Sequence, residues 1–190
     1  MLLKLEQEII KFHPYNEQEK LDKNILLKLL KNEKNIFSRE NKICHFTASS
    51  WIINKEKTKV LMIYHNIYNS WSWTGGHADE ETNLLKVALI EAKEETGLEN
   101  IKVLLEDIFS IEILTVDGHM NNGKYISSHL HLNVTYLLEA NEGDILSIKE
   151  DENSGVCWVD IEKSEKISKE KKMRVIYKKL NKKLKKYLRS

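Results

Sequence analysis

Hydrophobic residues recur along the chain at two different spacings, and the change between them separates helical from strand-forming segments. In residues 2–12 and 17–31, apolar side chains stand three or four positions apart, on either side of Pro14, the single proline of the sequence. That spacing places them on one face of a helix, and a proline interrupts a helix. Two helices are therefore expected at the start of the chain.

Further along, hydrophobic residues alternate with polar ones or form short apolar runs, as they do in strands. The segments expected to form strands are 46–53, 60–64, 101–116, 125–138 and 156–159, the first two joined by a turn at 54–58. Helical spacing returns between Gly75 and Leu98 and near the C-terminus. This order predicts an α+β fold, an α/β/α sandwich with a mixed sheet between helices. We expect a helical extension at residues 1–42 and one domain at residues 43–190.

The expected helix in the middle of the chain carries three glutamates on one face. Glu91, Glu94 and Glu95 stand at positions i, i+3 and i+4, which a helix stacks along one side. Like charges at this spacing repel each other, and Lys93 projects to another side, so it does not neutralise them. A hard divalent cation such as Mg2+ or Mn2+ prefers carboxylate oxygens and would relieve the repulsion. The spacing favours a metal site, and an acidic solvent-facing helix is the alternative.

These residues resemble the Nudix box, the motif of the Nudix hydrolase family. The box reads Gly, five residues, Glu, seven residues, then Arg-Glu-U-x-Glu-Glu-x-Gly-U, where U is a bulky aliphatic residue. The positions of this chain that match are Gly76, Glu91, Glu94, Glu95, Gly97 and Leu98. Three positions depart from the motif: Thr82 replaces the first Glu, Ile90 the Arg, and Ala92 the first aliphatic residue. A match of this size at fixed spacing is a specific signal.

The departures concern the bracing of the box more than its metal ligands. In the family, the first Glu and the Arg resemble a structural ion pair, and loss of only one partner would leave an unpaired charge. We expect Thr82 to cap the helix and Ile90 to pack instead. The flanking segments HFTASSWIIN and SSHLHLNVTYLLEA also resemble family members whose box begins with GGHAD. The resemblance is therefore expected to cover residues 43–160.

The resemblance implies a metal-dependent pyrophosphohydrolase that cleaves a diphosphate bond in a nucleoside diphosphate linked to another moiety (NDP-X). The implied cofactor is Mg2+ or Mn2+, with a ligand set of Glu91, Glu94, Glu95 and the backbone carbonyl of Gly75. Glu91 or Glu94 is expected to orient or deprotonate the attacking water. Since some family members use a carboxylate from a distant loop, Glu150 and Glu152 are the alternatives for this role.

Two other functions are weighed against hydrolysis. One is a catalytically silent Nudix-fold module that binds a ligand or regulates; such members usually lose box carboxylates, whereas all three are present here. The other is an enzyme like isopentenyl-diphosphate isomerase, which resembles this fold. In this chain, Gly75 stands where the isomerase has its essential cysteine, and Cys44 lies too early in the sequence to replace it.

Histidines and one tryptophan lie where the family binds its substrate. His129 and His131 are two positions apart in an expected strand and so share a face, and His119 lies in the loop before them. We expect these three, with His77 in the box and Trp73 just before it, to bind the substrate. Ordinary packing is the alternative. A His-x-His pair could also bind zinc, although the spacing reveals no third ligand.

Charge is distributed unevenly along the chain. The net charge of the 190 residues is +1, yet residues 161–190 hold 13 Lys or Arg against three Glu. Apolar residues recur there at helical spacing. We therefore expect a terminal helix that docks on the body with its lysines outward, and binding to nucleic acid is the alternative.

Composition narrows the class of protein. Hydrophobic residues make up 41% and charged residues 31%, and no apolar run has the roughly 18 residues that a membrane helix needs. The N-terminal residues lack the pattern of a signal peptide, and Cys44 and Cys157 form no metal or disulfide pattern. We expect a cytoplasmic protein that acts on a small nucleotide substrate, without a membrane or nucleic-acid partner. A homodimer is left open.

Overall fold

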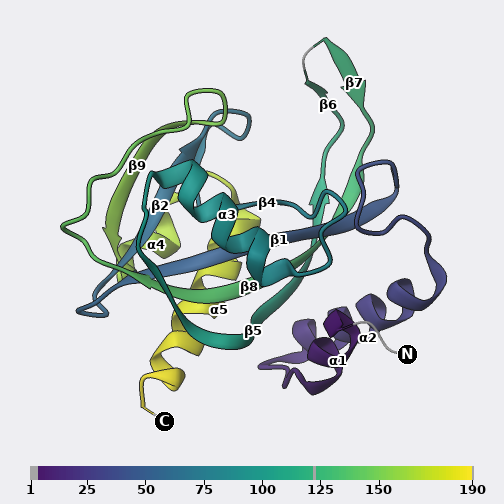
Figure 1. Ribbon diagram of the computed structural model, residues 1–190, viewed down its shortest axis with the longest axis horizontal. Coiled ribbons are helices and arrows are strands. Elements are labelled where there is room, and N and C mark those ends of the chain that lie inside the picture. The colour runs from purple at the N-terminus through teal and green to yellow at the C-terminus, as the bar shows by residue number, and fades with distance from the viewer. Residues whose placement is uncertain (1–3, 122, 190) are drawn as a thin grey trace. The chain divides into compact units, whose positions relative to one another are not determined.

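The computed structural model describes residues 4–121 and 123–189, which form five helices and nine strands (Figure 1). The helices are α1 (Lys4–Lys11), α2 (Glu17–Asn32), α3 (Leu84–Thr96), α4 (Ile161–Ile167) and α5 (Lys171–Tyr187). The strands are β1 (Cys44–Asn54), β2 (Lys59–His65), β3 (Ser70–Ser72), β4 (Thr74–His77), β5 (Ile101–Val116), β6 (His119–Asn121), β7 (Lys124–Ile126), β8 (His129–Ala140) and β9 (Asn153–Asp160). Within the described residues, every helix is too short or too polar to cross a membrane.

Most of the predicted elements are present. The predicted helix at 17–31 is α2, and the predicted strand at 101–116 coincides with β5. The helix predicted at 2–12 corresponds to α1, although residues 2 and 3 lie outside the described residues. The short strands β3, β4 and β6 were not predicted, because three or four residues are too few to establish a period. The single strand predicted at 125–138 is divided into β7 and β8.

A sheet of seven strands runs through the described part of the chain in the order β3-β2-β1-β8-β5, with β4 paired to β1 and β9 to β2. All positions of β1 are buried, as expected for a central strand covered on both faces. β1 and β2 form the predicted hairpin, with Ile53 opposite Val60. β6 and β7 form a second, two-stranded sheet, a hairpin inserted between β5 and β8 (Figure 1). The α+β class and the mixed sheet flanked by helices are confirmed.

The chain divides into two compact units. The first contains the described residues of Met1–Ser49, Gly75–Ala88 and Asp107–Tyr136, and the second contains those of Ser50–Thr74, Leu89–Glu106 and Leu137–Ser190. Several strands and α3 contribute residues to both units. The predicted boundary between residues 42 and 43 stays a prediction.

In the first unit, a buried glutamate fixes α2 to β5. Asn16 caps the helix, because its Oδ1 accepts the backbone N–H of Glu19 at 3.0 Å. The carboxylate of Glu19, a residue that is 0% exposed, accepts the backbone N–H of Tyr15 and the hydroxyl of Ser110, each at 2.7 Å. Such hydrogen bonds offset the cost of burying a carboxylate. A polar residue at the start of α2 thus anchors that helix to the sheet.

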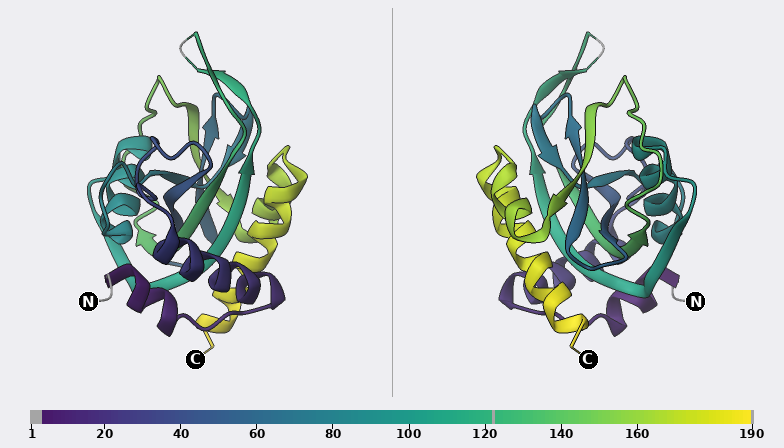
Figure 2. Two further views of the ribbon diagram at one scale, coloured as in Figure 1. Left: turned by 90° about the vertical axis from the view of Figure 1, so that its right-hand side faces the viewer. Right: turned by 90° about the vertical axis from the view of Figure 1, so that its left-hand side faces the viewer.

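In the second unit, the basic C-terminal helix buries its apolar face, as predicted. The side chains that it buries include Met173, Tyr177, Leu180 and Leu184. The ring of Tyr177 stacks on Trp51 at 5.3 Å and meets the edge of Trp73 at 5.7 Å. α4 contacts α5, β2 and β9, and Figure 2 shows the two helices side by side. The terminal helix is therefore part of the folded core of this unit.

Candidate functional site

The start of α3, in the first unit, is capped by Asn83. Its Oδ1 accepts the backbone N–H of Lys86 at 3.2 Å, the third residue of the helix. Glu81 supports this turn, because it accepts the N–H of Asn83 at 2.9 Å and pairs with Lys86 at 2.6 Å. The prediction that Thr82 caps the helix is therefore wrong by one residue. Thr82 and Asn83 are both good N-caps, and only the position of the first helical turn chooses between them.

The prediction that Ile90 packs in place of the family's arginine is also wrong. Ile90 is 44% exposed, whereas Ala88 and Ala92 on either side of it are completely buried. An arginine introduced at this position would keep its guanidinium in solvent, so it would not be a buried charge without a partner. The exposed pair of Glu81 and Lys86 braces this end of the box in this chain.

In the second unit, α3 carries all three predicted carboxylates, but their environments differ. Glu95 is 1% exposed, Glu91 is half-buried, and Glu94 is exposed. The pair at positions i and i+4 therefore lies toward the protein, while Glu94 lies nearer to solvent. A carboxylate as buried as that of Glu95 is costly to keep ionised unless cations or hydrogen-bond donors meet it.

The loop between β8 and β9 is fastened to the C-terminal end of α3. The side chain of Asn153 donates to the carbonyl of Glu95 at 2.9 Å, and the N–H of Ser147 donates to the carbonyl of Thr96 at 2.9 Å. These bonds satisfy carbonyls that a helix end leaves without partners. Gly97, with φ of +73°, ends the helix in the left-handed conformation that glycine adopts readily.

The same loop brings Lys149 between two carboxylates. Its Nζ lies 2.9 Å from Glu94 and 3.0 Å from Glu152. Partial burial acts to lower the pKa of Lys149, but the hydrogen bonds to Glu94 and Glu152 outweigh it and raise the pKa above its usual range. Of the two loop carboxylates proposed from the sequence, Glu152 thus shares a lysine with a box glutamate. Glu150 is exposed, and its backbone carbonyl accepts from Asn66 at 3.2 Å.

Gly75 lies in the first unit, where β4 pairs with β1. A Cβ atom on this glycine would stand 2.4 Å from the carbonyl oxygen of Ala48 and 2.7 Å from Cα of Ser49. Close approach of the two strands therefore explains the glycine. Its expected role as a carbonyl ligand to a metal stays a prediction.

Trp73 lies in the second unit among core aromatics. It is 7% exposed, and its backbone N–H donates to the Tyr177 hydroxyl at 3.3 Å. This environment matches ordinary packing, the alternative left open for this residue. Its role in binding the substrate stays a prediction.

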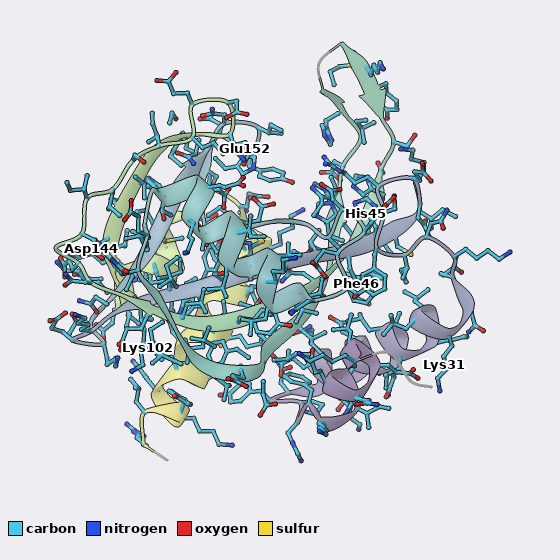
Figure 3. All side chains as sticks on the ribbon, viewed as in Figure 1. Lys31, His45, Phe46, Lys102, Asp144 and Glu152 are labelled. Carbon is cyan, nitrogen blue, oxygen red and sulfur yellow. The ribbon has the colours of Figure 1, made fainter. Side chains whose placement is uncertain are left out.

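The first unit gathers four histidine rings into one cluster, which we call the histidine cluster: His45, His77, His129 and His131. Nε2 of His131 lies 3.2 Å from Nε2 of His77 and 3.1 Å from Nε2 of His129. The His45 ring lies 4.9 to 5.2 Å, between centroids, from the other three. His45 stands near the start of β1, below the β6–β7 hairpin (Figure 3). The cluster confirms that His129 and His131 share a face of β8.

Burial keeps three rings of this cluster uncharged. Burial is the largest cause lowering the pKa values of His45, His77 and His131, and the neighbouring rings lower them further. The pKa of His77 falls to about 4 and that of His131 to about 2. At neutral pH, these three rings are therefore neutral.

Sequence reasoning did not include His45 in the site and did not join His77 to the pair on β8. The three strands that supply these rings are far apart in the chain. The signal that was available is a histidine at the start of a fully buried strand. His119, also predicted to bind substrate, lies on β6, where its Nδ1 contacts the carbonyl of Asp117 at 2.9 Å.

Comparison with known proteins places this fold. The model of the NUDIX domain family matches residues 45–180. A C. elegans Ap4A hydrolase complex has a TM-score of 0.56 and 22% identity, over 75% of this chain and 96% of that one. A Nudix hydrolase from M. smegmatis has a TM-score of 0.52 and 14% identity, over 73% and 84%. The E. coli dihydroneopterin triphosphate pyrophosphohydrolase has a TM-score of 0.52 and 14% identity, over 70% and 92%. At these identities, the structural likeness shows the fold alone. No curated protein matches the chain in sequence.

Proposed function

Because the chain belongs to the Nudix family and is a hydrolase of diphosphate bonds, we propose that it cleaves NDP-X compounds in a reaction that depends on Mg2+ or Mn2+. The observation that supports this proposal is the set of three carboxylates on α3. Glu91 and Glu95 lie toward the protein, and Glu94 is held by a lysine of the β8–β9 loop. Helix and loop thus bring several negative charges near one positive charge.

The donor set fits a hard divalent cation. Carboxylate oxygens from Glu91, Glu94 and Glu95 are the ligand type that Mg2+ and Mn2+ prefer, and the family resemblance adds the carbonyl of Gly75. A metal held there would neutralise charge on the phosphoryl oxygens and acidify a bound water. Burial of Glu95 supports the proposal, because a cation offsets the cost of an ionised carboxylate in that position.

The chain offers three candidates for the catalytic base: Glu91, Glu94 and Glu152. Lys149 pairs with the last two, and a carboxylate is a suitable acceptor for a proton from water. The ammonium of Lys149 is also a positive charge that a diphosphate can contact. Glu152 therefore joins the two box glutamates as a candidate, ahead of the exposed Glu150.

The predicted substrate contacts differ in their suitability. His119 lies on the β6–β7 hairpin with a half-exposed ring, so we propose it for the moiety X. His77 and His131 are half-buried and neutral and carry no charge to attract a phosphate. Their mutual contacts, and that of His131 with His129, favour a cation as ligand. No observation favours a silent module or an isomerase over hydrolysis.

The proposal is tested with a substrate panel and one pair of variants. Nucleotide sugars, dinucleoside polyphosphates, NADH, ADP-ribose and nucleoside triphosphates are incubated with Mg2+ or Mn2+. Glu95→Gln should lower kcat by about a hundredfold or more, because it removes the charge of a ligand while keeping its shape. Glu99→Gln, at an exposed residue just beyond the helix, is the matched control and should leave kcat unchanged. Near wild-type turnover of Glu95→Gln at saturating Mg2+ would refute the assignment.

A further inference from the structure

We propose that the histidine cluster is a second metal site, separate in chemistry from the carboxylates of α3, and that it binds a borderline divalent ion such as Zn2+. Nitrogen atoms of His45, His77 and His131 are the core ligands, and His129 is the fourth. The site would join β1, β4 and β8 within the first unit. The proposal does not depend on the proposed substrate.

The separations between the ring nitrogens suit tetrahedral coordination. One nitrogen from each of His45, His77 and His131 lies within 4.8 Å of the other two. The Nε2 atoms of His77 and His129 lie 3.2 Å and 3.1 Å from that of His131. With zinc–nitrogen bonds of about 2.0–2.1 Å, two ligands of a tetrahedral site stand about 3.3 Å apart. The His45 ring has to move toward the other rings to reach this separation when an ion binds.

Hydrogen bonds on the far side of two rings leave their inner nitrogens without a proton. Nδ1 of His45 lies 3.0 Å from the carbonyl of Asn41, and Nδ1 of His129 lies 2.8 Å from the carbonyl of Ser127. A carbonyl oxygen can only accept a hydrogen bond, so each Nδ1 carries the hydrogen. Nε2 of a neutral ring then has a free lone pair. An N–H directed at a backbone carbonyl is also the usual way in which proteins orient a histidine ligand.

Hydrogen bonds among the rings do not satisfy the cluster. Nε2 of His131 can carry one hydrogen, yet it contacts both His77 and His129. Nε2 of His45 is buried and has no hydrogen-bond partner within the described residues. An unsatisfied buried polar atom is costly, and one cation at the centre would satisfy every inward-facing lone pair.

The ligand type selects the class of metal. Imidazole nitrogens suit zinc and its neighbours in the transition series, whereas Mg2+ prefers oxygen. Four protein ligands leave no open position, so the site is structural. β4 carries Gly75 and Gly76 immediately before His77, and a bound ion would thus fix the strand that begins the Nudix box.

The test is titration of the chelator-treated full chain with Co2+, a visible probe of tetrahedral sites that zinc occupies. We expect the intense visible bands of tetrahedral Co2+ to saturate at one equivalent per chain, and Zn2+ to abolish these bands by displacement. His131→Ala and His45→Ala should each weaken binding by about tenfold or more, while His13→Ala, at an exposed histidine of the same unit, should not. Glu95→Gln should leave this signal intact, which separates the cluster from the carboxylates of α3.

If a cluster variant does not fold, measurements on the wild-type protein alone still test the proposal. Zn2+ should raise the unfolding temperature of wild type, because it binds the folded state. Absence of visible Co2+ bands in folded wild-type protein would overturn the proposal. Unchanged Co2+ affinity in folded His131→Ala and His45→Ala would also overturn it.

Discussion

Gly97→Ala should destabilise the protein and disturb the loop that supports the carboxylates. At φ of +73°, an alanine costs about 1–2 kcal/mol relative to glycine. Its Cβ would also lie 2.1 Å from Oγ of Ser147 and 3.0 Å from the backbone N of Ser147. The hydroxyl can rotate away, but the backbone must shift and weaken its bond to Thr96, worth about 0.5–1.5 kcal/mol. We therefore expect a loss of about 2–3 kcal/mol in all.

Urea unfolding of two further variants separates the causes of this loss. Gly123 has φ of +76° and open space around its position, so Gly123→Ala measures the backbone cost alone, about 1–2 kcal/mol. Adding Ser147→Gly to Gly97→Ala removes the Cβ of Ser147, which would lie 3.1 Å from the added methyl, together with the hydroxyl, and should restore part of the difference. Because Lys149 and Glu152 lie on the displaced loop, kcat should fall as well. Gly97→Ala within about 0.5 kcal/mol of wild type would refute this account of the helix end.

Three further predictions concern other parts of the structure. Tyr177→Ala should lower the free energy of unfolding in urea by about 3–5 kcal/mol, because the buried ring contacts two tryptophans. Val175→Ala, at a position 71% exposed, should change this free energy little, and equal effects of the two variants would contradict a docked α5. Burial lowers the pKa of His65 below its ordinary 6.5, against the opposing charge of Glu152, so the unfolded chain binds more protons and stability falls as pH drops below about 6.5. His65→Asn should reduce this loss of stability between about pH 7.5 and 5.5, and an unchanged pH profile would contradict the prediction. Lys149→Met should change the free energy of unfolding by less than about 1 kcal/mol. The variant should bind Mn2+ more tightly in calorimetry, because an ammonium no longer competes for Glu94, and weaker binding would contradict Glu94 as a ligand.

Local patterns in the sequence were enough to predict much of the fold and the helix that carries the proposed metal ligands. The spacing of Glu91, Glu94 and Glu95 depends only on helical geometry, and α3 carries all three. The buried face of α5 follows from the period of its apolar residues in the same way. Features that depend on a single helix boundary or on tertiary packing were predicted wrongly, as Thr82 and Ile90 show.

The histidine cluster could not be predicted in full for a different physical reason. His129 and His131 are neighbours on one strand, so their shared face follows from the two-residue period. His45 and His77 join them only because β1 pairs with both β4 and β8 in the sheet. The local periodicity of the sequence does not determine the order of the strands. The carbonyls of Asn41 and Ser127 that orient two of the rings lie in loops, which no pattern in the sequence singled out.

Hydrolysis of the best NDP-X substrate in H2(18)O, with Mg2+ and analysis of the products by mass spectrometry, tests the central proposal most directly. Water must add across the diphosphate bond, so that one phosphorus gains a hydroxyl and the other keeps the bridging oxygen. The proposal predicts a nucleoside monophosphate and a phosphorylated X, with one labelled oxygen in one of the two phosphates. No turnover with any member of the panel, or unlabelled products that retain the diphosphate, would contradict it.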